Sequence, residues 1–462
     1  FRRVLFRSGT NSTGEYANKG FFNFNSNALN NALGATVNIT DSVFNNNDTD
    51  INNSGTLNLF GNDSINTIAG TGSTFIKQNL NQNTIVNFKD NVSQDNFTLE
   101  NGTLNANGTI NANNNINIIN GTANFNNIVN TNNFTQYAGN VYANSSFNAN
   151  NASVDADATL NVAASDLNVN NAVKNAGIIN LGAGTLETAI SNNNSNGTIN
   201  TLGNVNLNNA ITNNALNIDA NTLTIGQNGA LTLSAFSNAA NAALIASQNN
   251  KYDNIILGNF SNNAALNYAI DAALSSKSAD ILNANSDATG SVVLNSIALN
   301  SGSNNKYTKV TISNSALQNA ISGYGASLFE GTTYNWIVKN DDNQGAYVLF
   351  TNQDINNLVI AVRDANQNTY NMTADESVLT DINQIGIDDP NLNTSSIGAL
   401  QGNNMVIEGA GFSVNGDNKD GISTAAGQTL NIQNVNGRNS TGEYANKGFF
   451  NFNSNALNNA LG

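Results

Sequence analysis

The stretch VNITDSVFNNNDTDINNSGTLNLFGNDSIN, from Val37 to Asn66, contains the pattern that decides the fold. Val37, Ile39 and Val43 alternate with polar residues, and the alternation returns at Leu57 and Leu59. Alternation at period two indicates a strand with one buried face. Gly, Asn and Asp separate the apolar groups, which predicts strands of about three to five residues joined by tight turns.

The same pattern continues on both sides of this stretch, from about Ala35 to Ala235. Many of its segments begin with Gly, then Thr or Ala, then an apolar or small residue. These starts lie at Gly55, Gly102, Gly108, Gly121, Gly184, Gly197 and Gly229. Their spacing is irregular, so the sequence predicts a repeated strand-and-turn unit and not a strict period.

The composition is dominated by Asn, which makes up close to a quarter of the chain, while charged residues are only 10% and Pro occurs once. Asn-rich tracts are also typical of disordered or aggregating segments, and that interpretation is an alternative. Disorder is favoured by high charge, abundant Pro and few apolar residues. Here hydrophobic residues make up 39% of the chain and recur in a regular pattern, which favours a folded structure.

A parallel β-helix can pair Asn side chains through hydrogen bonds between coils, which a sandwich or a barrel does not offer. Its coils lie about 4.8 Å apart, so an amide at a turn can bond to the equivalent amide above and below. A buried amide without a partner costs about 1–3 kcal/mol, whereas a stacked ladder pairs each one. We therefore predict an all-β chain that folds as a right-handed parallel β-helix, with two facing antiparallel sheets as the alternative.

The segment from Val37 to Asn66 resembles the coils of right-handed β-helix passengers of bacterial autotransporters and polymorphic outer-membrane proteins. In those coils an S-x-F-x-N-N pattern precedes a G-T-L strand, and Ser42, Phe44, Asn46 and Asn47 match its S, F, N and N. The resemblance covers about Ala35 to Ala235 and again Ile397 to Gly462. It implies a secreted protein displayed at the outer membrane of a bacterium.

Residues 236–353 differ in sequence pattern from residues 11–235, which are predicted to form the β-helix. They are predicted to form a capping module. Asn238–Ala246 and Asn262–Leu274 are rich in Ala and predict short helices. The stretch TTYNWIVKNDDNQGAYVLFT, Thr332–Thr351, predicts an antiparallel hairpin that contains Trp336, the only Trp. Such a module would cover the open edge of a solenoid.

The two ends of the chain are related. Residues 439–462 repeat residues 11–34 letter for letter, so we interpret the chain as one period of a tandem array or as an assembly joined at a repeat. Residues 397–462 would then begin a second β-helix. Residues 354–396 are acidic, contain the sole Pro, and are predicted to be a linker. Residues 1–10 match nothing downstream and are predicted to be a non-native leader.

Several classes of function are disfavoured by composition. The chain has no Cys and no His, so disulfides, thiolate metal sites and the usual general base are missing. A formal net charge of −15 repels nucleic acid and anionic lipid. No run of apolar residues is long enough for a membrane-spanning helix.

Catalysis remains to be considered, because parallel β-helices also include polysaccharide lyases and hydrolases, which need converging acidic residues. The candidate pairs are Asp155 with Asp157, Asp341 with Asp342, and Asp388 with Asp389. We interpret the first as a solvated strand face, the second as turn residues of the hairpin, and the third as part of the linker. We predict no catalytic, cofactor-binding or metal-binding residue and no cofactor.

These observations predict a secreted surface β-helix that acts as a structural stalk and adhesin without catalysis. The alternative is a secreted toxin or a carbohydrate-processing β-helix enzyme. The expected partner is a receptor or glycan on a host or neighbouring cell, and not nucleic acid. Contact with the membrane is expected only through a translocator outside this sequence window.

Overall fold

The computed structural model describes residues 21–22, 29–41, 43–44, 51–80, 82–192, 197–249, 251–262, 264–285, 289–305, 307–341, 345–351, 361–362, 368–373, 376–377, 396–400, 402–411, 413–415, 420–425, 427–434, 436–437 and 449–452. The chain divides into two units. Unit 1 is residues 1–269 with 280–292, and unit 2 is residues 270–279 with 293–462.

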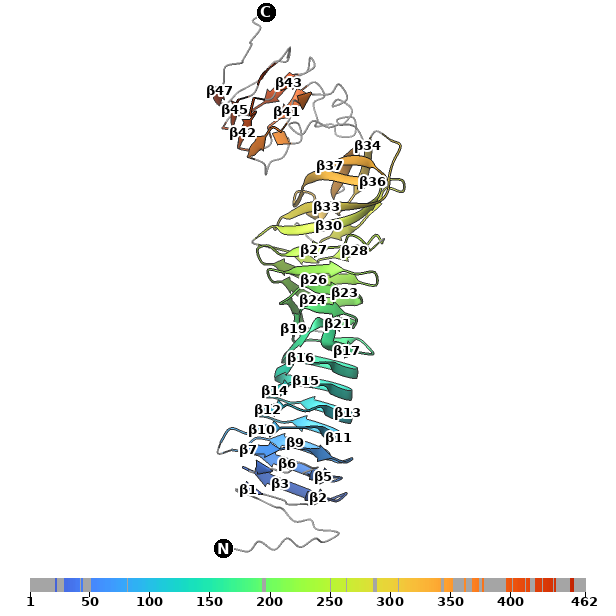
Figure 1. Cartoon of the computed structure of the whole chain (residues 1–462), viewed down its shortest axis with the longest axis vertical. Helices are drawn as coiled ribbons and strands as arrows, with labels where there is room; N and C mark the ends of the chain where they lie inside the picture. The colour runs from blue at the N-terminus through green and yellow to red at the C-terminus, as the bar shows by residue number, and fades with distance from the viewer. Residues whose placement is uncertain are drawn as a thin grey trace, which may run out of the picture. The chain divides into compact units, whose positions relative to one another are not determined.

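Unit 1 is a stack of parallel coils, and Figure 1 shows its strands lying one above another from β3 to β26. Most of its parallel strands form a 26-stranded sheet, and β20 (Gly184–Leu186), β23 (Val205–Leu207), β25 (Thr222–Ile225) and β27 (Ala243–Ile245) pair in parallel in a second sheet. The solenoid has about 11 turns. This confirms the predicted parallel β-helix, and the short strands follow from the apolar alternation between Gly- and Asn-rich turns.

Most strands of unit 1 fall into three sets, and the strands of each set pair in parallel with their copies in adjacent coils. The first set contains β2 (Leu29–Asn31), β5 (Ile51–Asn53), β8 (Ile68–Ala69), the starts of β11 (Val92–Leu99), β13 (Ile110–Ile118), β15 (Val129–Ala143) and β16 (Phe147–Ala163), and β17 (Leu167–Val169).

The second set contains β3 (Thr36–Thr40), β6 (Thr56–Phe60), β9 (Ser73–Lys77), later parts of β11, β13, β15 and β16, β18 (Val173–Asn175), β21 (Ile190–Asn192), β24 (Ala210–Ile218) and β26 (Ala230–Asn238). The third contains β4 (Val43–Phe44), β7 (Asn62–Ile65), β10 (Ile85–Phe88), β12 (Thr103–Ala106), β14 (Thr122–Phe125), the ends of β15 and β16, β19 (Ile178–Gly182), β22 (Thr198–Thr201), the ends of β24 and β26, and β29 (Asn259–Phe260).

The core is built from columns of inward-facing residues, one from each coil. In the second set the column is Val37, Leu57, Thr74, Phe97, Ile116, Phe134, Ala152, Val173, Ile190, Ile211 and Leu231. All are buried. Burying one large apolar side chain stabilises the fold by about 1.5–3 kcal/mol, so the apolar alternation also fixes the register of each coil.

Aromatic residues join neighbouring columns of this core. The rings of Phe134 and Phe147 meet edge to face with centroids 4.7 Å apart, and those of Phe88 and Phe97 meet at 6.0 Å. Edge-to-face geometry is the arrangement that aromatic pairs prefer. Each pair joins two strand sets, because Phe134 and Phe147 belong to the second and first, and Phe88 and Phe97 to the third and second.

Glycines stack at one corner of the coils. Gly102, Gly121 and Gly139 have φ of 105°, 95° and 78°, in the left-handed region that favours glycine. A Cβ atom on Gly121 would lie 2.3 Å from the carbonyl oxygen of Gly102, and one on Gly139 would lie 2.2 Å from that of Gly121. These glycines therefore allow successive coils to approach closely at the turn.

The parallel coils continue past residue 235, where we expected the capping module to begin. β27 (Ala243–Ile245) pairs in parallel with β25 (Thr222–Ile225), and β28 (Asn254–Ile256) with β32 (Ile281–Asn283). The prediction of short helices at Asn238–Ala246 and Asn262–Leu274 is wrong. The described residues there form turns, β27 and β30 (Leu266–Ala273), because pairing with the neighbouring coil overrides the helix propensity of Ala.

The predicted hairpin around Trp336 is confirmed in unit 2. An antiparallel sheet contains β34 (Tyr307–Thr311), β38 (Gly345–Thr351), β37 (Thr332–Asp341) and β36 (Tyr324–Phe329) in that order. Trp336 is buried opposite Phe350, and its indole N–H donates a hydrogen bond to Ser327 Oγ at 3.1 Å.

The rest of unit 2 contains further parallel pairs. β39 (Thr369–Asn371) pairs with β42 (Asn404–Glu408), which pairs with β45 (Thr429–Gln433), which pairs with β47 (Phe449–Phe452). Most of the predicted linker lies outside the described residues, but β39 shows that part of it is a paired strand. Residues 1–10 lie outside the described residues, as do Ser42, Asn46 and Asn47 of the family pattern.

We predict that Gly121→Ala destabilises unit 1 much more than Gly34→Ala does. Both glycines have positive φ, but a Cβ atom on Gly34 has no neighbour within 4 Å, whereas one on Gly121 meets the backbone of Gly102. Positive φ alone should cost Gly34→Ala about 1–2 kcal/mol. Urea unfolding followed by far-UV circular dichroism measures both, and equal losses would contradict close coil contact at Gly121.

Candidate binding surface

Ladders of Asn cover the outer face of unit 1. Asn105 donates from Nδ2 to Asn87 Oδ1 at 2.8 Å, and Asn124 donates in the same way to Asn105 at 2.8 Å. These residues face outward between buried neighbours such as Leu104 and Ala106. The predicted amide ladders are therefore present, and they lie along strand faces as well as at turns.

Parallel ladders repeat this arrangement on the described coils. Their members are Asn111, Asn130, Asn148 and Asn168; Asn96, Asn115, Asn133, Asn151 and Asn171; Asn132, Asn150 and Asn170; and Asn107, Asn126 and Asn144. In each of them the later coil donates to the earlier coil. Stacking thus pairs side chains that are only partly buried and would otherwise be left to water.

One ladder is longer than the others and contains a tyrosine. Strand pairing places Ser64, Asn87, Asn105, Asn124, Tyr142, Asn161, Asn180, Asn200, Asn217 and Ser237 in one outward column, which we call the long column. Tyr142 is 40% exposed and interrupts the chain of amide bonds. The amide bonds resume from Asn180 to Asn161, at 2.7 Å.

Two hollows lie beside the second half of the long column. The first has a volume of about 300 Å³ and includes Asn161 and Asn180 in its wall, and the second has a volume of about 690 Å³ and includes Asn200, Asn217 and Ser237. Both are lined by Leu202, which is 56% exposed. We call the two hollows together the ladder groove.

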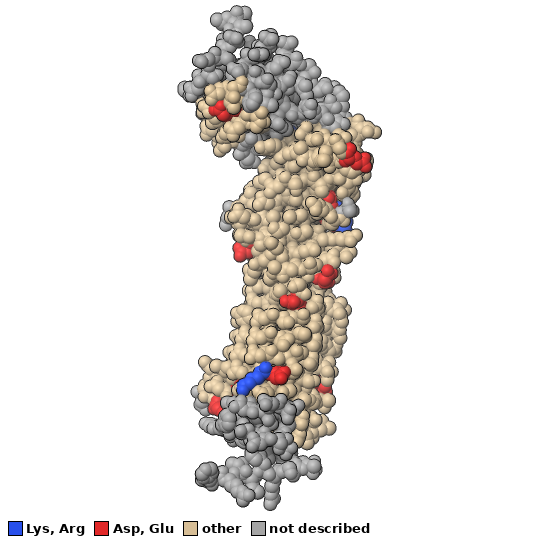
Figure 2. Space-filling view, viewed as in Figure 1, with Lys and Arg blue, Asp and Glu red and all other residues tan. Residues whose placement is uncertain are grey.

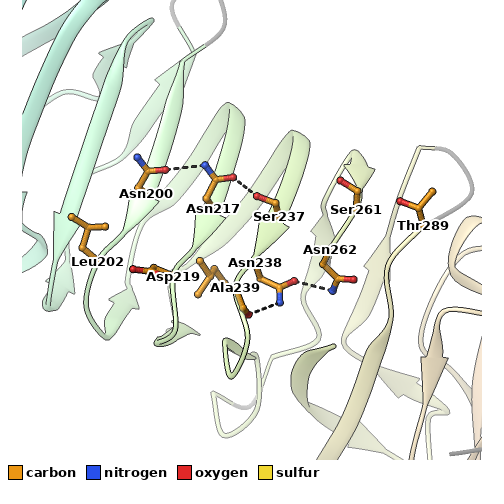
Figure 3. Close-up of a pocket in the computed structure, with 11 residues that line it drawn as sticks. Asn200, Leu202, Asn217, Asp219, Ser237, Asn238, Ala239, Ser261, Asn262 and Thr289 are labelled. Carbon is orange, nitrogen blue, oxygen red and sulfur yellow. Dashed lines mark hydrogen bonds between the residues drawn. The ribbon is translucent and has the colours of Figure 1, made fainter. Parts of the chain in front are cut away.

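Figure 3 shows the larger hollow with the bonds from Asn217 to Asn200 and from Ser237 to Asn217 along one side. On the other side Asn262 donates to Asn238 Oδ1 at 2.9 Å. Asp219 is the carboxylate in the wall of this hollow, and Asp166 is the one in the smaller hollow; neither wall contains Lys or Arg. The walls of the ladder groove therefore combine apolar side chains such as Leu202 with amides, one carboxylate in each hollow and, in the larger hollow, hydroxyls.

The face of the molecule in Figure 2 has few charged residues, in keeping with the 10% charged composition. The described coils carry isolated ion pairs, such as Lys77 with Glu100 at 3.3 Å. An exposed ion pair contributes little to stability, about 0–1 kcal/mol. Hydrogen bonds between neutral amides therefore dominate the polar contacts of this surface.

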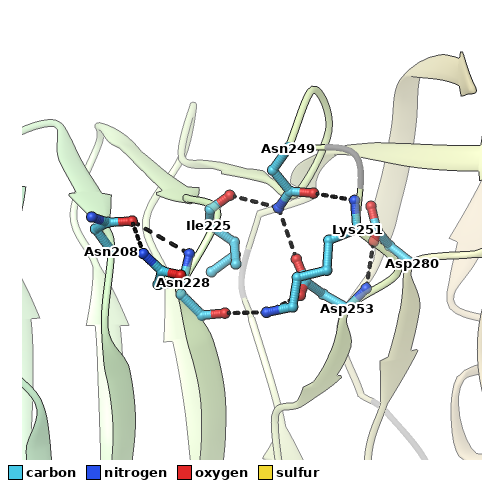
Figure 4. Close-up of polar contacts among 8 residues, drawn as sticks. Asn208, Ile225, Asn228, Asn249, Lys251, Asp253 and Asp280 are labelled. Carbon is cyan, nitrogen blue, oxygen red and sulfur yellow. Dashed lines mark hydrogen bonds and ion pairs between the residues drawn. The ribbon is translucent and has the colours of Figure 1, made fainter.

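A second polar cluster lies at the turn before β28 (Figure 4). Lys251 Nζ lies 3.2 Å from Asp253 Oδ1 and donates to the Gly229 carbonyl at 3.2 Å. Asn249 Nδ2 donates to Asp253 Oδ2 at 3.0 Å, and the Asp253 backbone N–H donates to Asp280 Oδ1 at 2.7 Å. The cluster thus joins three coils, because Gly229, Asp253 and Asp280 belong to successive turns.

Tyr268 is buried close to this cluster, and its hydroxyl has no hydrogen-bond partner. Burial raises the pKa of the Tyr268 phenol well above its usual value of 10.0, and the carboxylates of Asp280 and Asp253 raise it further. An unpaired buried hydroxyl destabilises a fold by about 1–3 kcal/mol.

The acidic pairs considered from sequence do not form a converging site in the described residues. Asp155 accepts from Ser153 Oγ at 3.0 Å and is partly exposed, while Asp157 is exposed. Asp341 ends β37 opposite Gly345, and Asp342, Asp388 and Asp389 lie outside the described residues. Among described residues, no three acidic side chains gather where they could hold a metal ion.

The long column and the Asp253 cluster were not predicted as sites. The signal for the column is an Asn between two apolar residues, as in Leu160-Asn161-Val162 and Ile179-Asn180-Leu181. It recurs at intervals of 17 to 20 residues. The Asp253 cluster leaves no comparable pattern, because its two acids are 27 residues apart.

Comparison with protein-family models, curated proteins and solved structures gives no match to this chain. The fold is thus supported by the structure itself, and membership of the autotransporter family stays a prediction. Within the described ranges, none of the helices has the length and apolar character that crossing a membrane requires.

We predict that Asn200→Asp lowers the stability of unit 1 by about 1–2 kcal/mol at pH 7. The aspartate cannot donate to Asn180 Oδ1, which lies 2.8 Å from the Asn200 amide nitrogen, although it can still accept from Asn217. At pH 3, about one unit below the usual pKa of Asp, the introduced carboxyl group is protonated and regains a hydrogen-bond donor. Urea unfolding at both pH values measures the free energy of unfolding, with Asn200→Ala as the control. Asn200→Asp should be less stable than Asn200→Ala at pH 7 but not at pH 3.

We predict that Tyr268→Phe stabilises unit 1 by about 1 kcal/mol, because it removes an unpaired buried hydroxyl. Since the folded-state pKa is raised, the folded chain holds the phenol in its neutral form, and the stability of the parent chain falls as the pH rises past about 10. The variant should therefore lose less stability between pH 9 and 11 in chemical denaturation. Tyr252→Phe, at a residue 40% exposed, is the control and should behave as the parent chain.

Proposed function

We propose that this chain is a secreted bacterial surface β-helix of the autotransporter passenger type, which acts as a structural stalk and adhesin and performs no catalysis. The observation that carries the proposal is the uninterrupted parallel pairing of the second strand set from Val37 to Leu231. A stack of this kind can be extended coil by coil without enlarging its core.

The backbone pairing between coils supports the proposal that the stalk resists proteases. Each inner strand has a partner above and below, as β13 has in β11 and β15. A protease can cut such a ladder only after local unfolding has separated a strand from its partners. About 11 turns at about 4.8 Å each would give a stalk segment of about 53 Å.

The ladder groove supports binding more than hydrolysis. Glycoside hydrolysis usually requires two carboxyl groups on either side of the scissile bond, about 5–10 Å apart. The two carboxylates of the groove, Asp166 and Asp219, follow β16 and β24, which are three coils apart, so they stand about 14 Å apart along the stack, with no Lys or Arg in either wall. Rows of amides and hydroxyls hold a ligand without activating water, so we place adhesion at this surface.

The proposal predicts that proteinase K at 37 °C leaves a large fragment of unit 1 intact for hours. Mass spectrometry should assign it to the paired coils between about residues 51 and 249, and Gly121→Ala should shorten its lifetime because it opens a coil contact. Rapid cutting at many sites within these coils would contradict the stalk. Release of reducing sugar ends from a polysaccharide, lost in Asp219→Asn, would favour the enzyme alternative.

A further inference from the structure

The amides beside the ladder groove use only half of their hydrogen-bonding capacity within the ladder. Asn180 donates once, to Asn161, and accepts once, from Asn200; Asn200 in turn accepts from Asn217. A primary amide has two N–H donors and two acceptor lone pairs. Each coil therefore offers one further donor and one further acceptor at this wall, repeated about every 4.8 Å.

The charge of the groove narrows the class of ligand. Its walls contain Asp166 and Asp219 and no Lys or Arg, so a polyanion such as nucleic acid or an acidic polysaccharide would meet repulsion without compensation. An extended peptide binds mainly through main-chain bonds at a free strand edge. The long column presents side-chain amides from paired strands instead, which suits hydroxyl groups that donate and accept at once.

Tyr142 adds an aromatic surface to the same column. It pairs with Asn161, which lines the smaller hollow, so it stands one coil from the start of the groove. Its side chain is 40% exposed on the outer face, although the flanking Val141 and Ala143 are buried. The aromatic ring of tyrosine has a large apolar face, which suits the C–H face of a sugar ring.

We propose that the ladder groove binds an unbranched neutral glycan along the long column, with Tyr142 as the stacking platform at one end. The inference rests on the proposed adhesive function and names its ligand class. Asn161 to Ser237 occupy five coils, which is about 19 Å of column and enough for a short oligosaccharide. The free amide donors and acceptors would bond to successive sugar hydroxyls.

Isothermal titration of the full chain tests the proposal with neutral oligomers of β-linked glucose, mannose, xylose and N-acetylglucosamine, and with oligogalacturonate as the acidic probe. We expect binding to at least one neutral oligomer and none to oligogalacturonate. Tyr142→Ala should weaken that binding about tenfold, and Tyr142→Phe, which keeps the ring, should leave it within about twofold.

Tyr137→Ala is the matched control, because Tyr137 lies on the same strand and is 50% exposed but stands outside the long column. It should leave affinity within about twofold. Equal losses in Tyr142→Ala and Tyr137→Ala would overturn the proposal. Tighter binding of oligogalacturonate or of an extended peptide would also overturn it.

Absence of binding to every neutral oligomer would overturn the glycan inference alone if the coils still resist proteinase K, because the stalk would then stand. Loss of protease resistance in the parent chain would instead defeat the stalk. The two results are independent, because titration measures the affinity of the ladder groove for a ligand, whereas proteolysis measures the resistance of the coils to unfolding. Each variant is checked for parent-like far-UV circular dichroism before titration.

Discussion

The hydrogen bond between equivalent Asn side chains in adjacent coils is the constraint on which the outer surface depends. On the outer face it forms when the two residues occupy equivalent positions in paired strands, as Asn105 and Asn124 do. Each such bond contributes about 0.5–1.5 kcal/mol at most in net terms, but the ladders contain many. They also fix side chains in a regular array, so the same bonds that stabilise the coil order the surface that a ligand would meet.

Inside the coils, the apolar columns impose the same register from the opposite face. A slip of one residue would turn Leu160 and Val162 outward and bury Asn161, which would cost both the apolar contacts and the amide ladder. The two faces therefore specify one alignment together. This agreement explains how short strands of weak individual preference can form a long stack, since local and non-local interactions favour the same structure.

Much of the fold was accessible from sequence because it depends on local alternation. Leu57 and Leu59 indicated a strand with one buried face, and Asn content indicated ladders between coils. The prediction of helices in the Ala-rich segments failed because helix propensity is only a weak local preference. In the structure, Leu244 pairs with Leu223 of the neighbouring coil and is buried. The ladder groove is lined by residues from several coils, and the raised pKa of Tyr268 depends on its burial and on Asp280 and Asp253, so neither has a local signal.

The outer ladders also have a direction. In each of the Asn ladders described, the later coil donates and the earlier coil accepts, as Asn151 does towards Asn133 and Asn171 towards Asn151. Each coil of these ladders thus turns oxygen lone pairs toward the coil that follows it in the sequence. When a coil is added at the C-terminal end of such a stack, it supplies the donors, and no completed bond has to be broken.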